Sequence, residues 1–467
     1  MKTFSTIAAL AAVSSVYAVP TPTEELVARS SSSGTATTNS VGSLAPVTVK
    51  GNAFWVGDTR FYMRGVDWQP GGSSDPTDPM ADEATCTRDI AEFKKLGLNA
   101  VRVYTVDNTA NHDTCMKALD DAGIYLVLDV NTPKYSLNRA TPSPSYNAPY
   151  LQSLFATIDS FAKYNNTLAF FSGNEVINDD TTTACAPYVK AVTRDMRQYI
   201  GSQGYRKIPV GYSAADVESN RYEMAAYMNC GTDDERSDFY AFNDYSWCDP
   251  SSFATAWSTK IEKLTGYGLP IFLSEYGCNT NTRKFEEVAS LYGSDTSAVY
   301  SGGLVYEYSE EGSKYGLVTI SGNDVTEGPD FTALQTALAA QANPTGDGGY
   351  NSTGGASSCP AQSDSWDVTG DALPAIPLKA AAYMKSGAGA GPGLTGSGSQ
   401  NAGDTSPGTA TAGSGTVDAV ATGSASSSSG SSSTKKSAAS SLSPMDSRPM
   451  AIAGVVMFFS FFGAMLL

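Results

Sequence analysis

The stretch Leu168–Val176, LAFFSGNEV, joins a strand-like apolar run to two polar side chains at its end. The run is apolar and aromatic, which is typical of a strand buried on both faces. It stops at Gly173-Asn174-Glu175, where an amide and a carboxylate stand side by side. In a barrel of parallel strands, the side chains that meet substrate lie at the carboxyl ends of the strands. The stretch therefore predicts a buried barrel strand that presents Asn174 and Glu175 to a substrate.

Comparable runs, apolar or rich in β-branched and aromatic residues, recur at regular intervals. The other seven are Phe61–Trp68, Ala100–Val106, Tyr125–Val130, Lys207–Ser213, Phe239–Tyr245, Pro270–Gly277 and Gly303–Ser309. Segments with helical spacing lie between them, at Glu83–Leu96, Tyr150–Tyr164, Ala186–Ile200, Phe253–Leu264 and Lys284–Leu291. Strands that alternate with helices in this number predict an α/β fold, a (β/α)₈ TIM barrel, over residues 45–345.

The alternative interpretation is an open, doubly wound sheet. A nucleotide-binding version of that fold needs a glycine-rich turn after its first strand. The residues at that place, Trp68-Gln69-Pro70-Gly71-Gly72, do not match the fingerprint, so the barrel is preferred.

The first 18 residues have the pattern of a cleaved secretion signal. Lys2 precedes the apolar run Ile7–Val13, and Val16-Tyr17-Ala18 suits a signal peptidase site. The apolar run is too short to span a membrane. A Ser/Thr-rich segment, residues 19–44, then leads to the predicted barrel.

The last residues, 442–467, have the pattern of a signal for a glycosylphosphatidylinositol (GPI) anchor. Met450–Leu467 is uncharged, and a polar spacer and a group of small residues precede it. Ser437 is the predicted attachment residue; an ordinary carboxyl-terminal transmembrane helix is the alternative. Residues 387–441 are rich in Gly, Ser, Ala and Thr, which predicts a disordered, O-glycosylated stalk. Residues 346–386 form an extension between barrel and stalk.

Composition excludes several kinds of chemistry. A net charge of −17 argues against nucleic acid as a partner, because phosphate attracts the opposite sign. Seven cysteines in a secreted chain predict disulfides with one thiol left over, and none has the Cys-x-x-Cys spacing of a metal site. The single histidine, His112, has polar neighbours that predict a surface loop, and alone it cannot build a zinc site. We therefore expect no metal and no cofactor.

The remaining candidates for catalytic groups are carboxylates. Glu175 and Glu275 each end an apolar strand, the fourth and the seventh, which lie across the barrel mouth from one another. A converging pair in which one carboxyl is protonated and the other ionised is what glycoside chemistry requires. Asn174 could then bond a sugar 2-hydroxyl, and Tyr245 could hold Glu275 in position. The alternative is that both glutamates are solvated loop residues.

Further polar and aromatic side chains end the predicted strands. They are Arg102, Tyr104, Asp129, Asn131, Asn243, Tyr245, Tyr276, Glu307 and Tyr308, with Tyr135 in a loop nearby. Tyrosine rings stack on the C–H faces of sugars, although core packing explains most tyrosines equally well. Sequons at Asn165 and Asn351 predict glycosylation.

Several motifs, in order, resemble glycoside hydrolase family 72, the fungal GPI-anchored 1,3-β-glucanosyltransferases. Besides Gly173-Asn174-Glu175 and Ser274-Glu275-Tyr276-Gly277, they are Arg102-Val103-Tyr104, Leu128-Asp129-Val130, Ser136-Leu137-Asn138-Arg139, Asp216-Val217-Glu218-Ser219-Asn220-Arg221 and Val305-Tyr306-Glu307-Tyr308. The resemblance covers about Val47–Gln341. It implies retaining transglycosylation, in which an internal β-1,3 bond is cut and the new reducing end passes to the non-reducing end of another glucan.

The resemblance also implies residue roles. Glu175 becomes the acid/base and Glu275 the nucleophile, with carboxyl groups about 5–5.5 Å apart. The implied substrate contacts are Tyr104, Asp129, Asn131, Tyr135, Ser136, Asn138, Arg139, Asn174, Asp216, Arg221, Tyr245 and Tyr308. The implied disulfides, which the topology also suits, are Cys86–Cys115, Cys230–Cys359 and Cys248–Cys278, with Cys185 unpaired.

The resemblance finally implies partners and a location. The partners are a β-1,3-glucan donor, a glucan acceptor and, through the GPI anchor, the outer face of the plasma membrane, with the cell wall as a further location. We expect a monomer. We expect the cysteine-rich carbohydrate-binding module of some members to be absent, because only Cys359 follows the predicted barrel. Two alternatives stay open: a β-1,3-glucan hydrolase, and a non-catalytic adhesin that binds glucan.

Overall fold

The computed structural model describes residues 40–410 of the 467-residue chain. The predicted secretion signal, most of the Ser/Thr-rich segment, residues 411–441 of the predicted stalk and the predicted anchor signal lie outside these residues. No helix between residues 40 and 410 is long and apolar enough to cross a membrane.

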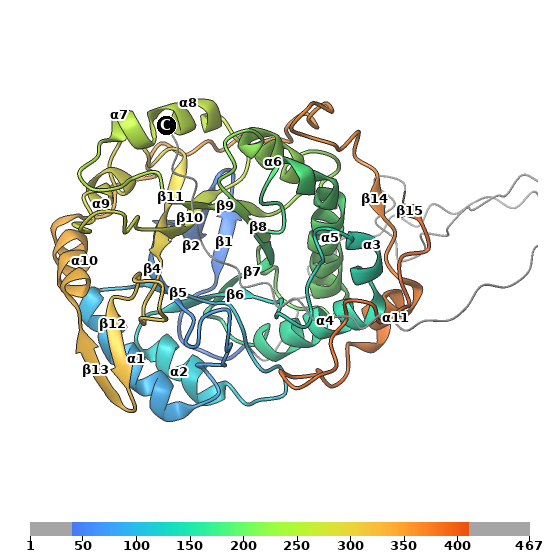
Figure 1. Ribbon diagram of the computed structural model, residues 1–467, viewed down its shortest axis with the longest axis horizontal. Helices are drawn as coiled ribbons and strands as arrows, with labels where there is room; N and C mark the ends of the chain where they lie inside the picture. Colours follow the sequence, from blue (N-terminus) through green and yellow to red (C-terminus); the bar gives the residue numbers. More distant parts are fainter. Residues whose placement is uncertain (1–39, 411–467) are drawn as a thin grey trace, which may run out of the picture. The chain divides into compact units, whose positions relative to one another are not determined.

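A closed barrel of parallel strands forms the centre of the described chain (Figure 1). Its strands are β4 (Met63–Trp68), β5 (Ala100–Val103), β6 (Tyr125–Asp129), β7 (Thr167–Asn174), β8 (Val210–Ala215), β9 (Phe239–Asp244), β10 (Ile271–Tyr276) and β11 (Tyr300–Val305). They follow one another around the barrel in chain order, and β11 closes it by pairing with β4. The TIM barrel predicted from the sequence is confirmed.

Helices follow the strands and cover the barrel (Figure 1). They are α1 (Glu83–Leu96), α2 (Asp113–Asp121), α3 (Pro142–Ser145), α4 (Ala148–Phe161), η1 (Asp180–Cys185), α5 (Ala186–Ser202), α6 (Arg221–Met228), α7 (Phe253–Ala256), α8 (Ser258–Leu264), α9 (Glu287–Leu291) and α10 (Pro329–Ala340). Local signals set their ends. The Asp82 carboxylate caps α1 by accepting the Thr85 N–H, and Gly97, at a φ of 70°, ends it.

A small antiparallel sheet closes the amino end of the barrel. It consists of β1 (Val47–Lys50), β2 (Ala53–Val56) and β3 (Thr59–Phe61). From β2, the Phe54 ring packs 5.9 Å from those of Phe239 and Phe272, which lie early in their barrel strands. These aromatic rings fill the interior at this end, so the opposite end is the one open to a substrate.

The chain after α10 returns along the barrel. It contains α11 (Leu378–Ser386), which packs on α4 and α5, and the short antiparallel pair β14 (Leu373–Pro374) and β15 (Thr409–Ala410). The hairpin β12 (Val318–Ser321) and β13 (Asp324–Glu327) precedes α10.

The predicted start of the stalk at Gly387 was wrong, because residues 387–410 pack on the folded chain through the hydrogen bonds described below.

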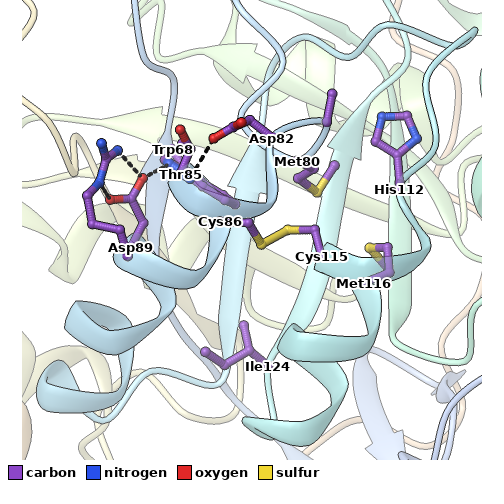
Figure 2. The surroundings of a disulfide bond; sticks show 12 residues. Trp68, Met80, Asp82, Thr85, Cys86, Asp89, His112, Cys115, Met116 and Ile124 are labelled. Atoms are coloured by element: carbon purple, nitrogen blue, oxygen red, sulfur yellow. Dashed lines mark hydrogen bonds and ion pairs between the residues drawn. A yellow bond between two sulfur atoms is a disulfide. The ribbon is translucent and has the colours of Figure 1, made fainter. Parts of the chain in front are cut away.

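All three implied disulfides are present, and Cys185 is a buried free thiol. Cys86–Cys115 joins α1 to α2 (Figure 2), Cys248–Cys278 joins the chain after β9 to the chain after β10, and Cys230–Cys359 fixes the extension. Burial raises the pKa of the Cys185 thiol to about 12, which keeps it protonated and unreactive.

His112 is not on the surface, as its polar neighbours had predicted. It is buried where α2 begins, close to Met116 (Figure 2). Its Nε2 lies 2.7 Å from Asp78 Oδ2, and its ring packs 4.6 Å from that of Phe161. A carboxylate partner and an aromatic neighbour let the imidazole replace its hydration inside the fold.

Candidate active site

Glu175 follows β7 in an unusual backbone conformation. Its φ is 46°, in the left-handed region that residues other than glycine rarely adopt. Contacts on both sides hold it there: its N–H donates to Ser213 O at 2.9 Å, and its carbonyl accepts from Arg139 Nη2 at 2.8 Å. The carboxylate accepts a hydrogen bond from Asn243 Nδ2 at 2.9 Å. Glu175 is therefore fixed at the open end of the barrel, half-buried.

Glu275, in β10, is 7% exposed and is surrounded by donors. The hydroxyls of Tyr104 and Tyr245 each donate to one of its carboxylate oxygens at 2.7 Å, and Arg102 Nη1 lies 3.3 Å from it. Burial raises the pKa of Glu275 to about 7, and the charge of Glu175 raises it as well, while Arg102 and the two phenols lower it. The predicted support of Glu275 by Tyr245 is confirmed as a contact.

Arg102 is a completely buried cation between two acids. Its Nε donates to Asp129 Oδ2 at 2.8 Å, and Nη1 reaches Glu275. The guanidinium also lies 3.9 Å from the centre of the Tyr104 ring. It thus orients Glu275 and places a positive charge beside it, which favours the ionised carboxylate.

A chain of neutral side chains leads from Glu175 to Ser274, the residue before Glu275. Asn243 Nδ2 donates to both Asn174 Oδ1 and Glu175, and Asn243 Oδ1 accepts from Ser274 Oγ, next to Glu275 in β10. Ser213 Oγ donates to Asn174 Oδ1 at 2.7 Å. The Asn174 carbonyl is thus occupied, while its amide nitrogen donates to no residue in 40–410, so the N–H groups are available to a ligand.

Asp67, at the end of β4, is a third carboxyl beside the pair. It is completely buried, and within residues 40–410 neither of its side-chain oxygens has a hydrogen-bond partner. Burial raises its pKa well above the usual value, and neighbouring Glu275 and Asp129 raise it further, against the lowering effect of Arg102. Burial and the neighbouring acids therefore favour the protonated form of Asp67.

A groove of about 370 Å³ opens at the carboxyl ends of β4 to β7. Half of the implied substrate contacts line it: Tyr104, Asp129, Asn131, Ser136, Arg139 and Asn174. Gln69 and Thr132 line it too. With Asn174 on its wall and Tyr104 bonded to Glu275, the groove leads directly to the carboxylate pair.

Three implied contacts are not brought to this groove. Tyr308 is completely buried, and its hydroxyl donates to Asp89 of α1 at 2.9 Å. Asp216 and Arg221 pair with one another at 2.7 Å, and Lys260 of α8 binds the same aspartate. The polar groups of these three side chains bind other residues of the protein, so we no longer expect them to contact substrate.

Two further implied contacts shape the loop between β6 and α4 rather than line the groove. Asn138 Oδ1 accepts the N–H groups of Ala140 and Thr141, as in a tight turn. Tyr135 is 4% exposed, and its hydroxyl accepts the N–H of Gly398.

Sequence reasoning missed two tyrosines next to Glu275. The ring of Tyr315 lies 5.5 Å from that of Tyr245, and the ring of Tyr306 lies 5.4 Å from that of Tyr315. Tyr306 directly follows β11, so the strand-end rule that singled out Tyr308 could have found it. Tyr315 carries no such signal. Asn243 had been recognised as a strand end but not as a partner of Glu175.

Comparison with known proteins places this site in a family. The profile of the glucanosyltransferase family, glycoside hydrolase family 72, matches residues 36–342. The chain is 69% identical over 355 residues to 1,3-beta-glucanosyltransferase gel1 of Aspergillus fumigatus, covering 76% of this chain and 78% of that protein. It is 51% identical over 374 residues to 1,3-beta-glucanosyltransferase GAS5 of Saccharomyces cerevisiae, covering 79% and 77%.

Solved structures agree. The crystal structure of Saccharomyces cerevisiae Gas2p in complex with laminaritriose and laminaritetraose superposes with a TM-score of 0.66 at 38% identity, covering 71% of this chain and 77% of that one. A second structure of the same protein, ScGas2 in complex with compound 9, gives a TM-score of 0.67. The chain therefore belongs to the glucanosyltransferase family, glycoside hydrolase family 72.

Proposed function

We propose that the protein is a 1,3-β-glucanosyltransferase that elongates β-1,3-glucan by a retaining, two-step mechanism. The observation that carries the proposal is the unequal pair of carboxylates at the open barrel end. Glu275 receives three donors, including a buried cation, whereas Glu175 receives one neutral amide. Such a difference assigns attack to Glu275 and proton transfer to Glu175.

In the first step, a Glu275 oxygen forms a bond to the anomeric carbon of the donor glucan. The bond from that carbon to the bridging oxygen breaks, and Glu175 gives its proton to the departing oxygen. The result is a glycosyl ester on Glu275 and a released fragment. The Tyr104 and Tyr245 hydroxyls hold both Glu275 oxygens, which orients the carboxylate for attack.

In the second step, Glu175 takes a proton from a hydroxyl at the non-reducing end of an acceptor glucan. The acceptor oxygen displaces Glu275 from the anomeric carbon, and two inversions restore the β configuration. The available Asn174 amide is suited to donate to the sugar 2-hydroxyl, where hydrogen bonds strengthen in the transition state. The groove-lining residues Asp129, Arg139 and Tyr104 are the proposed donor contacts.

The rest of the proposal concerns location. The activity named for the relatives, 1,3-beta-glucanosyltransferase, and the laminari-oligosaccharides in complex with Gas2p support glucan as the substrate of this chain. We further propose secretion, glycosylation at Asn165 and Asn351, and a GPI anchor at Ser437 on the outer face of the plasma membrane. The anchor signal rests on the sequence pattern.

The test is incubation with a laminari-oligosaccharide whose reducing end has been reduced, followed by chromatography of the products. Products longer than the substrate support transfer, whereas shorter products alone would favour the hydrolase. Glu275→Gln and Glu175→Gln should each lower the rate by about 10²–10⁴-fold. The control is Glu262→Gln, which changes an exposed carboxylate on α8. Unchanged activity in both site variants would refute the assignment of catalysis to these two glutamates.

A further inference from the structure

Residues 387–400, GAGAGPGLTGSGSQ, form a strap that is built into the catalytic domain. The strap follows α11 and runs beside α4 (Figure 1). At its start, Gln152 of α4 donates to the carbonyls of Ala388 and Ala390 at 3.0 and 2.8 Å. Near its end, Asn147 Nδ2 donates to Ser399 O inside the protein.

Glycine is needed in the strap because neighbouring atoms or the backbone conformation exclude a side chain, not because the segment is flexible. A Cβ on Gly391 would lie 2.1 Å from Asn108 Oδ1, and one on Gly396 would lie 2.3 Å from the Tyr135 hydroxyl. Gly393 and Gly398 have φ values of 61° and 86°, which residues other than glycine rarely adopt. The glycine-rich composition is typical of a flexible linker, but here it allows the strap to lie in close contact with the rest of the fold.

The surface that the strap contacts is the loop at residues 132–139. Ser399 N–H donates to Lys134 O at 3.0 Å, and Gly398 N–H donates to the Tyr135 hydroxyl at 3.3 Å. Gln400 Nε2 donates to Ser136 O at 2.7 Å, and Lys134 Nζ donates back to Leu394 O at 3.0 Å. The strap therefore binds three consecutive residues of this loop.

The same loop forms a wall of the substrate groove. Thr132, Pro133, Ser136, Leu137 and Arg139 line that wall. Arg139, at the end of the loop, also donates to the carbonyl of Glu175. The loop thus lies between the strap and the groove.

We propose that the strap is a specificity element: it fixes the loop at residues 132–139 so that sugar units of the donor glucan bind along this wall. The proposal rests on the proposed transferase function. Because the strap contacts neither glutamate, its perturbation should weaken the binding of longer donors while the chemical step at Glu275 persists.

The test uses the full chain with Gly396→Ala, which places a methyl group against the Tyr135 hydroxyl. KM and kcat are measured on laminari-oligosaccharides of increasing length. We expect KM for long donors to rise about three- to tenfold, as loss of one or two hydrogen bonds implies, with kcat within about twofold. Short donors, which do not reach the wall, should show no change in KM.

Two further variants keep the test decisive. Tyr135→Phe removes the hydroxyl that the new methyl group meets, so Gly396→Ala combined with Tyr135→Phe should recover part of the lost affinity. The control, Gly201→Ala, adds a methyl group at an exposed, helical position of α5 where no atom lies within 4 Å. If Gly396→Ala does not fold, Gln400→Ala, which removes the contact with Ser136, replaces it.

Failure of the inference and failure of the proposed function look different. A wild-type protein without activity on glucan would refute the proposed function. An active wild type whose folded Gly396→Ala variant keeps the same KM at every donor length would overturn the strap inference alone. An equal loss of kcat at every donor length would overturn it too, because that result places the damage at the carboxylate pair.

Discussion

Replacing Tyr245 with phenylalanine isolates one determinant of the charge on Glu275. The change removes the hydroxyl that donates to Glu275 Oε2 at 2.7 Å and keeps the ring that packs against Tyr315. Tyr104 and Arg102 remain as donors to the other oxygen. The variant therefore tests a single hydrogen bond in an otherwise intact site.

The expected effect has a definite sign and size. The phenol donates to the carboxylate and so stabilises its charged form, which lowers the pKa of Glu275 from the value that burial alone would set. A hydrogen bond to a charged group contributes about 1.5–3 kcal/mol, and one pKa unit corresponds to about 1.4 kcal/mol. Loss of the hydroxyl should therefore raise the pKa of Glu275, which is about 7 in the intact site, by about one to two units.

The assay is the pH dependence of kcat/KM for glucan transfer. As the proposed nucleophile, Glu275 must be ionised to attack, so the acidic limb of the profile should move to higher pH by the same one to two units. Tyr315→Phe is the control, because this tyrosine belongs to the same aromatic cluster and forms no hydrogen bond to Glu275 in the described chain. An acidic limb that stays in place or moves to lower pH would refute the reasoning.

Two further predictions concern stability. The raised pKa of Asp67 means that the folded chain binds this proton more tightly than the unfolded chain, which releases it near pH ~4, so stability is lost as pH rises above that value. Asp67→Asn should therefore have a higher thermal midpoint than wild type at neutral pH and a smaller advantage at pH ~4; equal midpoints at neutral pH would contradict this. Cys359→Ser opens a disulfide between residues 129 apart in sequence and should lower the free energy of unfolding by about 2–5 kcal/mol in chemical denaturation. Cys185→Ser, at a thiol outside any disulfide, is the comparison, and an equal loss in both variants would show that the cross-link adds nothing.

The sequence was sufficient for the barrel and for the carboxylate pair because both follow from local patterns. The buried strands are short runs rich in apolar, β-branched and aromatic residues, and Glu175 and Glu275 stand directly where two such runs end. The fold then brings them to one opening, whatever the helices between them contain.

The contacts that the sequence did not predict mostly join residues that are distant from one another in the chain. The resemblance implied Asp216 and Arg221 as substrate contacts, but the two residues pair with one another and Lys260 from α8 also binds Asp216. His112 looked exposed until Asp78 and Phe161 were placed beside it. Each side chain finds its partner only when the chain is folded.

The glycine-rich strap shows a different limit. Its composition predicts a disordered segment, since glycine and serine bury little apolar area. In the structure, however, the absence of side chains at Gly391 and Gly396 lets the backbone of the strap lie against Asn108 and Tyr135. Composition alone does not distinguish a glycine that permits flexibility from one that permits contact.

The left-handed backbone at Glu175 has a consequence for how this site can be altered. Glycine and asparagine tolerate that conformation better than glutamate does. Substitution by either would relax the backbone and remove the carboxyl group in the same event. A search for more heat-resistant variants, made without an activity screen, would therefore favour loss of the proposed acid/base at this position. In the proposed mechanism, thermal stability and catalysis place opposite demands on this one residue.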